Sequence, residues 1–129
     1  DLKKKIPRIK VRGIDISKYA IKNAHSKVKK YLDIGCCSEL PYEDNSFDVV
    51  LAINTVHNLG LKKCAKAIRE INRVSKKKSF IMVDAYKNQT EKKKMFAWNL
   101  TAKTIMSRKK WIKFFKKNKY KGDYYWFTP

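Results

Sequence analysis

The strongest constraint on the fold is an amphipathic segment that lies between two short apolar runs. In this segment apolar residues recur at steps of three and four, the spacing of one face of an α-helix: Leu61, Cys64, Ala65, Ile68, Ile71 and Val74. The flanking runs, Phe47–Ile53 and Ser79–Ala85, are nearly unbroken apolar segments of the kind that form strands buried on both faces. A strand, a helix and a second strand in this order predict a parallel strand pair of an α/β fold.

The same alternation of strands and helices continues along the rest of the chain. Further strands are expected at Ile9–Asp15, Val28–Ile34 and Gly122–Phe127, and further helices at Lys18–Ala24, Glu91–Ile105 and Lys109–Asn118. Ser17 is placed to cap the first of these helices, and the turn-rich segment from Leu40 to Ser46 predicts a loop. No linker or internal repeat divides the sequence, so we expect one α/β domain over residues 1–129 with a mostly parallel sheet.

The charge of the chain invites a nucleic-acid interpretation. Lys and Arg number 32 against 11 Asp and Glu, a formal net charge of +21, and a basic surface gains affinity for nucleic acid by releasing phosphate counterions. However, the arginines that favour specific phosphate and base recognition are few: Arg8, Arg12, Arg69, Arg73 and Arg108. The lysines are spread along every segment, so a generally solvated basic surface is favoured over a nucleic-acid partner.

Cysteine content and hydropathy indicate in which cellular compartment the protein is expected. The three cysteines, Cys36, Cys37 and Cys64, form no C-x-x-C pair and are odd in number, so we expect neither disulfides nor a metal site. Secreted domains of this size usually pair their cysteines, and the prediction is therefore a protein of the reducing cytoplasm. No apolar stretch approaches the roughly 20 residues that span a bilayer.

Polar residues follow the predicted strands at the ends where α/β proteins bind ligands. In open parallel sheets, ligands bind beyond the carboxyl ends of the strands. Asp15 stands at such an end, and a carboxylate there can accept hydrogen bonds from both hydroxyls of a ribose. A helix cap is the alternative role for the same side chain.

Three segments, in order along the chain, resemble motifs of one enzyme family. Residues 35–50, Gly-Cys-Cys-Ser-Glu-Leu-Pro-Tyr-Glu-Asp-Asn-Ser-Phe-Asp-Val-Val, resemble the second motif of class I S-adenosylmethionine-dependent methyltransferases. Val11–Ser17 resembles the acidic loop after the family's second strand, and Ala67–Val74 resembles its later Glu-x-x-Arg-Val helix end. The likeness is nearest to small bacterial methyltransferases of the ubiquinone and menaquinone type. It implies a Rossmann-like, mostly parallel sheet, S-adenosylmethionine as cofactor and no metal.

The resemblance implies a role for each residue of the cofactor site. Asp15 would hold the ribose hydroxyls, Ile16 would pack on one face of the adenine, and Cys36 with Cys37 would line the adenine edge. Asn54, just after a predicted strand, would border the methionine moiety. The family often has Asp at the position of Cys36, so the hydrogen bond to the adenine amino group would be left to the backbone of Cys37.

The resemblance also implies that a strand and a glycine-rich loop of the family lie upstream of Asp1. Leu32–Cys36 imitates that glycine motif but lacks its later glycines. In the family's sheet the upstream strand lies between the strands predicted here at Ile9–Asp15 and Phe47–Ile53. We therefore expect a gap or a direct pairing between these two strands, and no turnover by the chain as given.

The acceptor side is predicted from residues that follow the later strands. His57 is a candidate general base, because a neutral imidazole can take the acceptor's proton, and packing or hydrogen bonding in the core is the alternative. Asp84 and Tyr86 are candidates for touching the acceptor, with structural caps as the alternative. A further group of apolar and aromatic residues belongs to the core or covers the acceptor: Met95, Phe96, Trp98 and Trp111.

The sequence therefore predicts methyl transfer from S-adenosylmethionine to a small-molecule acceptor, with the oligomeric state left open. A nicotinamide-dependent Rossmann oxidoreductase would share the acidic ribose residue, but the chain has no Tyr-x-x-x-Lys catalytic pair and carries the methyltransferase-like motif. A basic RNA-binding or RNA-methylating module is the second alternative, and its support is the charge alone.

Overall fold

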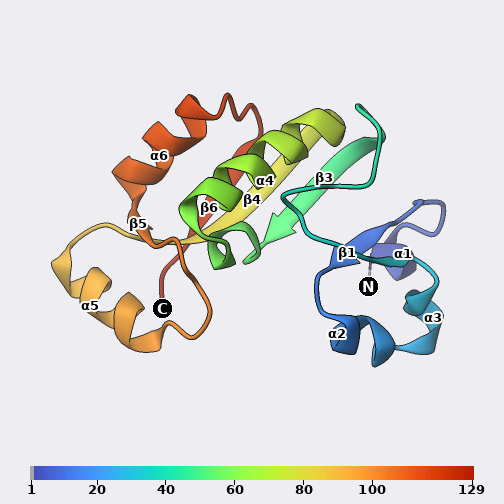
Figure 1. Cartoon of the computed structure of the whole chain (residues 1–129), viewed down its shortest axis with the longest axis horizontal. Helices are drawn as coiled ribbons and strands as arrows, with labels where there is room; N and C mark the ends of the chain where they lie inside the picture. Colours follow the sequence, from blue (N-terminus) through green and yellow to red (C-terminus); the bar gives the residue numbers. More distant parts are fainter. Residues whose placement is uncertain (1) are drawn as a thin grey trace. The chain divides into compact units, whose positions relative to one another are not determined.

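A computed structural model of the chain describes residues 2–129. The chain folds as two compact units, one that reaches to Cys37 and one formed by Ser38–Pro129 (Figure 1). Every strand pair in the described residues is parallel, and helices alternate with the strands except between β2 and β3. The predicted α/β class with a mostly parallel, Rossmann-like arrangement is therefore confirmed. Within the same residues, no helix is long and apolar enough to cross a membrane.

The first unit is a small two-stranded sheet with three short helices. Its elements are α1 (Leu2–Lys5), β1 (Gly13–Asp15), α2 (Lys18–Lys22), α3 (Ser26–Lys29) and β2 (Leu32–Ile34). β1 pairs with β2 in a register that places Ile14 opposite Asp33. As predicted, Ser17 caps α2, because its hydroxyl accepts the N–H of Ala20 at 3.1 Å.

Two strands of this unit are shorter than predicted. A strand that begins at Val28 is wrong, because Val28 lies in α3, whose first turn is capped by His25: Nδ1 of that ring accepts the N–H of Lys27 at 3.2 Å. Residues 9–12 are also outside any strand, so β1 begins only at Gly13. Local capping therefore overrides apolar alternation where the paired segment is short.

The second unit is a four-stranded parallel sheet organised around one long strand. Its strands are β3 (Phe47–Ile53), β4 (Ser75–Tyr86), β5 (Met106–Ser107) and β6 (Asp123–Phe127). β4 pairs with the other three, so it is the central strand. The helices are the 3-10 turn η1 (Val56–Asn58), α4 (Leu61–Val74), α5 (Gln89–Trp98) and α6 (Arg108–Lys117). β3 and α4 begin and end at the residues predicted for them.

The predicted helix Glu91–Ile105 is wrong in its second half. α5 ends at Trp98, and the side chain of Asn99 then bonds Ala102 in both directions: Nδ2 donates to its carbonyl oxygen at 3.0 Å, and Oδ1 accepts its N–H at 2.8 Å. Side-chain bonds of this kind compete with the helical backbone bonds. Residues 99–105 therefore form a loop.

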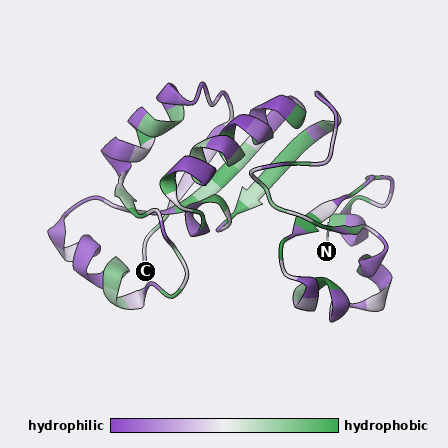
Figure 2. Cartoon of the chain, in the orientation of Figure 1, coloured by the Kyte–Doolittle hydropathy of each residue, from purple (hydrophilic) through white to green (hydrophobic). Residues whose placement is uncertain are grey.

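The core of the second unit is built from the sheet and helices α4 and α6. Both helices contact β4, and most of the buried apolar side chains come from these elements: Cys64, Ala67, Ile68, Ile71, Val74, Ile81, Val83, Ala85, Trp111 and Phe115. Val56 of η1 and Met95 of α5 are also wholly buried. Much of the surface that α4 turns outward is hydrophilic (Figure 2). Trp111 is wholly buried, and its indole N–H donates to the carbonyl oxygen of Asp84 at 3.0 Å. This bond ties α6 to the carboxyl end of β4.

β3 is well covered on one face only. The prediction of a strand buried on both faces is wrong, because the alternate residues Val49, Leu51 and Ile53 are 54%, 50% and 53% exposed. Ala52, which points to the other face, is 7% exposed. An apolar run makes burial of both faces favourable, but the elements packed around the strand decide which face is covered.

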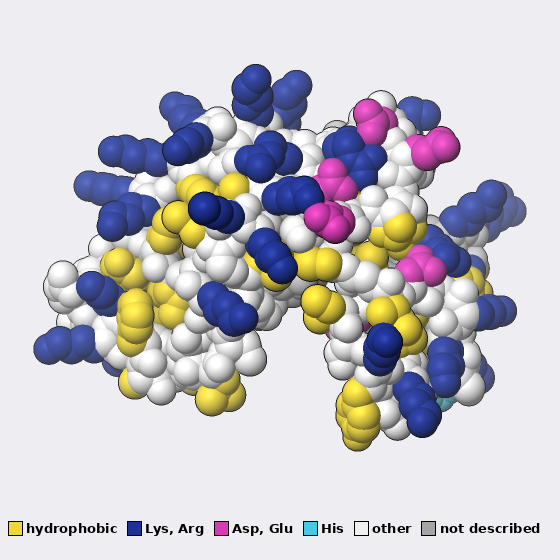
Figure 3. Space-filling view, viewed as in Figure 1, with side chains coloured by type: hydrophobic (Ala, Val, Ile, Leu, Met, Phe, Trp, Pro, Cys, Tyr) yellow, Lys and Arg dark blue, Asp and Glu magenta, His cyan; other side chains and the backbone are white. Residues whose placement is uncertain are grey.

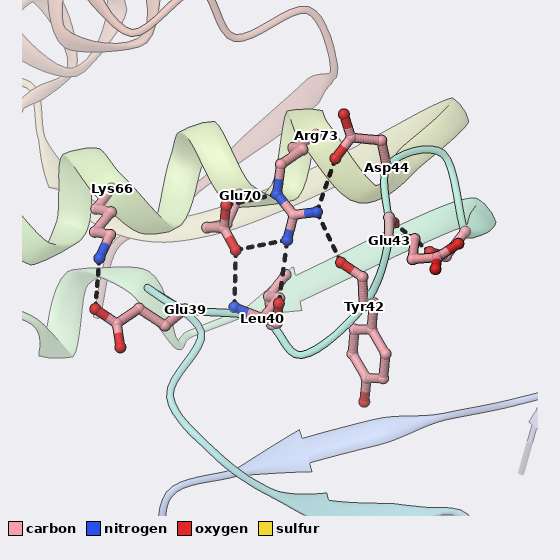
Figure 4. A network of polar contacts seen from close by, with 9 residues as sticks. Glu39, Leu40, Tyr42, Glu43, Asp44, Lys66, Glu70 and Arg73 are labelled. Carbon is pink, nitrogen blue, oxygen red and sulfur yellow. Dashed lines mark hydrogen bonds and ion pairs between the residues drawn. The ribbon is translucent and has the colours of Figure 1, made fainter.

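A network of polar contacts joins the loop before β3 to the end of α4 (Figure 4). The guanidinium of Arg73 donates to the carbonyl oxygens of Leu40 and Tyr42, at 3.1 and 2.7 Å, and to the Asp44 carboxylate at 2.9 Å. Glu70 accepts the N–H of Leu40 at 2.8 Å and accepts two bonds from Arg73, at 2.7 and 2.8 Å. Two motifs that lie far apart in the sequence are therefore parts of one structural clamp.

The chemistry of Arg and Glu explains the clamp. Glu70 and Arg73 are three residues apart on α4, so their side chains lie on the same face of the helix. The planar guanidinium offers five donors, which is what two carbonyls and two carboxylates require. The hydrogen bond from Arg73 lowers the pKa of Glu70, and partial burial of Glu70 opposes this. The stabilisation from Glu70 is therefore present above its ordinary pKa of 4.5 and is lost as the pH falls below it.

We expect Arg73→Lys to lower the free energy of unfolding by about 1 to 3 kcal/mol, because an ammonium cannot replace the bonds of the fork. Urea unfolding at neutral pH measures this. Arg8→Lys, at an exposed position outside the clamp, is the matched control and should change stability by less than about 0.5 kcal/mol. The stability gap between the native protein and Glu70→Gln should shrink as the pH falls below 4.5. Equal stability of Arg73→Lys and the native protein would show that the loop does not need the clamp.

Candidate active site

The carboxyl edge of the first unit brings together the residues predicted to bind adenosine. Because β1 and β2 are parallel, the residues that follow them emerge at one edge, where the N–H of Gly35 donates to the carbonyl oxygen of Asp15 at 3.0 Å. Asp15 is exposed, and its Oδ1 accepts the N–H of Ser17 at 2.8 Å. The carboxylate thus caps the start of α2 and is also accessible to a ribose hydroxyl.

Ile16, Cys36 and Cys37 complete this edge. Ile16 is 70% exposed, and an exposed apolar side chain of this size gains free energy when a ring packs on it. Cys36 and Cys37 are half-buried, and burial, with a smaller effect of Cys36, raises the pKa of the Cys37 thiol to about 11. The thiol is therefore uncharged at neutral pH. An exposed carboxylate, an exposed apolar side chain and the uncharged Cys37 thiol thus lie at one edge of this unit.

A cavity of about 170 Å³ lies at the carboxyl end of the second unit's sheet. Its lining comes from the residue after β3, from η1, from the end of β4 and from the segment at the end of α5: Asn54, His57, Asp84, Trp98, Asn99, Leu100 and Thr101. Four of these, Asn54, His57, Asp84 and Trp98, are residues named as candidates from the sequence. Asn54 has a φ of 51°, a left-handed conformation that Asn tolerates, and its N–H donates to the carbonyl oxygen of Met82 at 3.0 Å. The chain leaves β3 there and turns into η1.

His57 and Asp84 form a buried pair on the wall of this cavity. Their side chains are 4% and 3% exposed. Nδ1 of His57 accepts the backbone N–H of Asp84 at 3.2 Å, so this nitrogen carries no proton. In the neutral ring the proton is then on Nε2, which lies 3.6 Å from Oδ2 of Asp84. The other oxygen, Oδ1, is buried and has no hydrogen-bond partner among the described residues.

Burial sets the protonation of the pair. It lowers the pKa of His57, and the charge of Asp84 opposes this effect. It raises the pKa of Asp84, and the charge of His57 opposes that effect. Since a proton on Nδ1 would also break the bond from the N–H of Asp84, the neutral ring is the favoured form. This tautomer presents a donor, and Asp84 presents the acceptor. The role of His57 as general base stays a prediction.

The loop after α5 forms a wall of the cavity that the sequence did not reveal. The N–H groups of Lys103 and Thr104 donate to the carbonyl oxygen of His57, at 3.0 and 2.9 Å. The Thr101 hydroxyl donates to Oδ1 of Asn58 at 3.0 Å. These bonds fasten the loop to η1, so the segment beside His57 is ordered by contacts that are distant in sequence.

Asn99, Leu100 and Thr101 were missed because this segment was predicted as helix. The signal that could have found them is the pair of poor helix formers, Asn99 and Thr101, directly after an aromatic residue. Trp98 does line the cavity, and its ring packs on Phe127 with centroids 5.3 Å apart. Trp98 therefore belongs to the site, which is one of the two roles expected for it from the sequence.

The other predicted acceptor-side residues lie elsewhere. Met95 and Trp111 are wholly buried and belong to the core, while Phe96 is 55% exposed. Tyr86, the last residue of β4, does not line the cavity, and its ring lies 5.8 Å from the ammonium of Lys92. Within residues 2–129, no group of three or more His, Cys, Asp and Glu side chains is arranged to hold a metal ion.

A larger cleft, of about 1020 Å³, lies at the amino-terminal ends of β4 and β6. Its lining is rich in cations: Arg69, Arg73, Lys76, Lys77, Lys78, Lys117, Lys119 and Lys121. Lys and Arg side chains are, however, spread over much of the molecular face drawn in Figure 3. The cleft therefore concentrates cations, although Lys and Arg also occur over much of the rest of the surface.

Comparison with known proteins assigns the class and the family. Parallel strands with polar residues at their carboxyl ends are the arrangement of class I S-adenosylmethionine-dependent methyltransferases, and the family described as a methyltransferase domain matches residues 2–83. This match covers more than half of the chain, and the chain belongs to that family. Among curated proteins none matches the chain. The class implied by the sequence motifs is thus confirmed, and the ubiquinone and menaquinone type stays a prediction.

Solved structures share this fold at low sequence identity. The YcgJ protein of Bacillus subtilis is 21% identical with a TM-score of 0.64, over 87% of this chain and 53% of that one. An S-adenosylmethionine-dependent methyltransferase of Thermotoga maritima is 18% identical with a TM-score of 0.53, over 85% and 64%. The [4+2]-cyclase SpnF is 20% identical with a TM-score of 0.58, over 85% and 42%. In each case the chain spans less than two thirds of the other protein, and such identities show the fold alone.

We expect the imidazole of His57 to titrate below its ordinary pKa of 6.5, because burial disfavours the cation and Nδ1 already accepts a hydrogen bond. Nuclear magnetic resonance of the ring nitrogens measures this, with His25→Gln used to assign the two histidines. Asp84→Asn should lower the pKa further, since it removes the charge that opposes burial. The contribution of His57 to stability is then present above pH 6.5 and is lost as the pH falls. A pKa at or above 6.5 would contradict the neutral, buried ring.

Proposed function

We propose that this protein transfers a methyl group from S-adenosylmethionine to a small-molecule acceptor. The observation that carries the proposal is the family match over residues 2–83, which includes Asp15, Asn54 and His57. The polar residues at the strand ends of both units support it. The same match crosses the boundary between the units, which supports one methyltransferase domain over the whole chain.

In this proposal the cofactor is bound by the residues to which the family resemblance assigns that role. Asp15 accepts hydrogen bonds from the ribose hydroxyls, and Ile16 packs on the adenine. Cys36 and Cys37 border the ring, and Asn54 borders the methionine moiety. When bound, the cofactor supplies a methyl group activated by a sulfonium sulfur. The contribution of the chain is to position the reactants, and no metal is required.

The acceptor side of the proposal is the cavity beside His57 and Asp84, with Tyr86 at the nearby end of β4. A cavity of about 170 Å³ accommodates a small molecule or the reactive end of a larger one. The odd number of cysteines, with no C-x-x-C pair, supports a reducing cytoplasm as the location of the protein.

The rival functions have less support. A nicotinamide-dependent oxidoreductase would share the ribose-binding carboxylate, but the family match is to methyltransferases. The likeness to a [4+2]-cyclase is a reminder that one fold hosts several chemistries, so the transfer itself has to be measured. An RNA partner would use the basic cleft, but lysines are spread along every segment of the chain, which favours a generally solvated basic surface.

Binding to random-sequence RNA should be weak and should not depend on the cleft. If the lysines act only as a diffuse basic surface, the variant Lys76→Gln/Lys78→Gln should lose no more affinity than Lys3→Gln/Lys5→Gln, which removes the same charge elsewhere. Titration at several salt concentrations measures both. A steep salt dependence that only the cleft variant reduces would instead favour an RNA acceptor.

Calorimetry with S-adenosylmethionine and with a nicotinamide dinucleotide is the direct test of the cofactor. The first should bind, and Asp15→Ala should weaken its binding by about 1 to 3 kcal/mol, the cost of unpaired ribose hydroxyls. Asp15→Asn should also weaken it, although an amide oxygen can still accept the N–H of Ser17 and keep the helix cap. Asp48→Ala removes an exposed carboxylate from β3 and is the control.

Two outcomes would oppose the proposal. Binding of the dinucleotide alone would replace methyl transfer by hydride transfer as the function. Unchanged affinity in both Asp15 variants would leave this carboxylate as a helix cap only.

A further inference from the structure

We propose that the cavity at the carboxyl end of β4 receives a hydroxyl group of the methyl acceptor, and that Asp84 is the base that takes its proton. The inference rests on the proposed methyl transfer and names the substrate class of that same site. It assigns to His57 the part of a positioning residue.

One oxygen of the Asp84 carboxylate lacks a hydrogen-bond partner. The side chain of Asp84 is 3% exposed, yet Oδ1 has no hydrogen-bond partner among the described residues, and the residue lines the cavity. A buried acceptor left unpaired destabilises the fold. A ligand that donates a hydrogen bond from within the cavity would remove this cost.

Two hydrogen bonds fix the backbone of Asp84. The backbone N–H of Asp84 is bound by Nδ1 of His57 at 3.2 Å, and its carbonyl oxygen is bound by the indole N–H of Trp111 at 3.0 Å. Nε2 of His57 lies 3.6 Å from Oδ2. His57 therefore fixes the backbone of Asp84 and lies beside Oδ2, so Oδ1 is the carboxylate oxygen that has no partner among the described residues.

A neighbouring carboxylate favours a hydroxyl over an amine as the attacking group. A carboxylate beside an amine stabilises the ammonium form, which has no lone pair with which to attack a methyl group. A hydroxyl donates its proton to the carboxylate and keeps its lone pairs for the attack. The net charge of +21 adds to this, because it repels a cationic acceptor and tolerates a neutral or anionic one.

The other residues that line the cavity indicate the shape of the acceptor beyond its hydroxyl group. The exposed side of Trp98, whose ring is supported by Phe127, gives a flat apolar surface, and Leu100 adds a second apolar side chain. Asn54 offers an amide that can donate or accept one further hydrogen bond. The fit is to a compact alcohol or phenol with an apolar face next to its reactive hydroxyl.

In the proposed reaction the methyl group moves to the acceptor and the proton moves to Asp84. The acceptor oxygen forms a bond to the methyl carbon, and the carbon–sulfur bond breaks with its electron pair left on sulfur. The hydroxyl proton passes to Oδ1 of Asp84, and from there to solvent after the products leave.

Ligand binding can be measured without turnover. With the cofactor site filled by S-adenosylhomocysteine, ligand-detected nuclear magnetic resonance compares cyclohexanol, phenol and cyclohexylamine, which share a ring of the same size. We expect the hydroxyl probes to bind at least about tenfold more tightly than the amine, a difference equivalent to about 1.4 kcal/mol. The cyclohexanol and phenol arms distinguish an alcohol from a phenol as the source of the hydroxyl.

Two pairs of variants locate the binding. Asp84→Asn should weaken the hydroxyl probes at least about tenfold, while Asp123→Asn, at an exposed carboxylate of β6, should not. Leu100→Trp fills the cavity from a side chain that is 94% exposed, so it should block the probes without disturbing the core, and Leu61→Trp on α4 is its control.

The failures are distinguishable. If S-adenosylmethionine does not bind the native protein, the proposed function fails together with this inference. If the cofactor binds but no hydroxyl probe does, or if the amine binds more tightly, only the hydroxyl assignment is overturned. Unchanged probe affinity in both Asp84→Asn and Leu100→Trp would overturn the site itself.

Discussion

The second unit depends on the position of β4. This strand pairs in parallel with β3, β5 and β6, so its register cannot shift without moving three neighbours. The register also fixes its two ends, which have opposite chemistry. At the amino end the strand contributes Lys76–Lys78 to the basic cleft, and near the carboxyl end Asp84 reaches the small cavity. The site is therefore built by strand pairing first and by side-chain contacts second.

The parts of the fold that sequence patterns predicted best are those whose pattern continues over the whole element. β3 and α4 were predicted at their observed bounds, because β3 is a nearly unbroken apolar run and α4 keeps its apolar spacing of three and four residues throughout. Short segments were decided by capping instead: His25 starts a helix where a strand was expected, and Asn99 ends α5 early. A propensity summed over a few residues is weaker than one well-placed side-chain bond.

Part of the candidate site could also be predicted from the sequence, namely the residues at the ends of the strands. Parallel topology places strand ends at one edge, so Asn54, His57 and Asp84 could be chosen from their order alone. Leu100 could not, since the loop that carries it is held by the carbonyl oxygen of His57, more than forty residues earlier. Nor does sequence reveal which nitrogen of His57 carries the proton, because that follows from one backbone N–H.

The structural alternative for Asp84, a cap, would require different contacts. Carboxylates that stabilise this chain accept backbone N–H groups, as Asp15 does from Ser17 and Glu70 does from Leu40. In the described residues Oδ1 of Asp84 accepts none, and Oδ2 has only the imidazole at 3.6 Å. The net charge of +21 lowers the cost of a buried anion at long range, but it does not supply the missing donor. A buried carboxylate oxygen without a partner destabilises the fold, so a ligand explains Asp84 better than a structural role does. Sites that break a local rule at a cost in stability are typically functional.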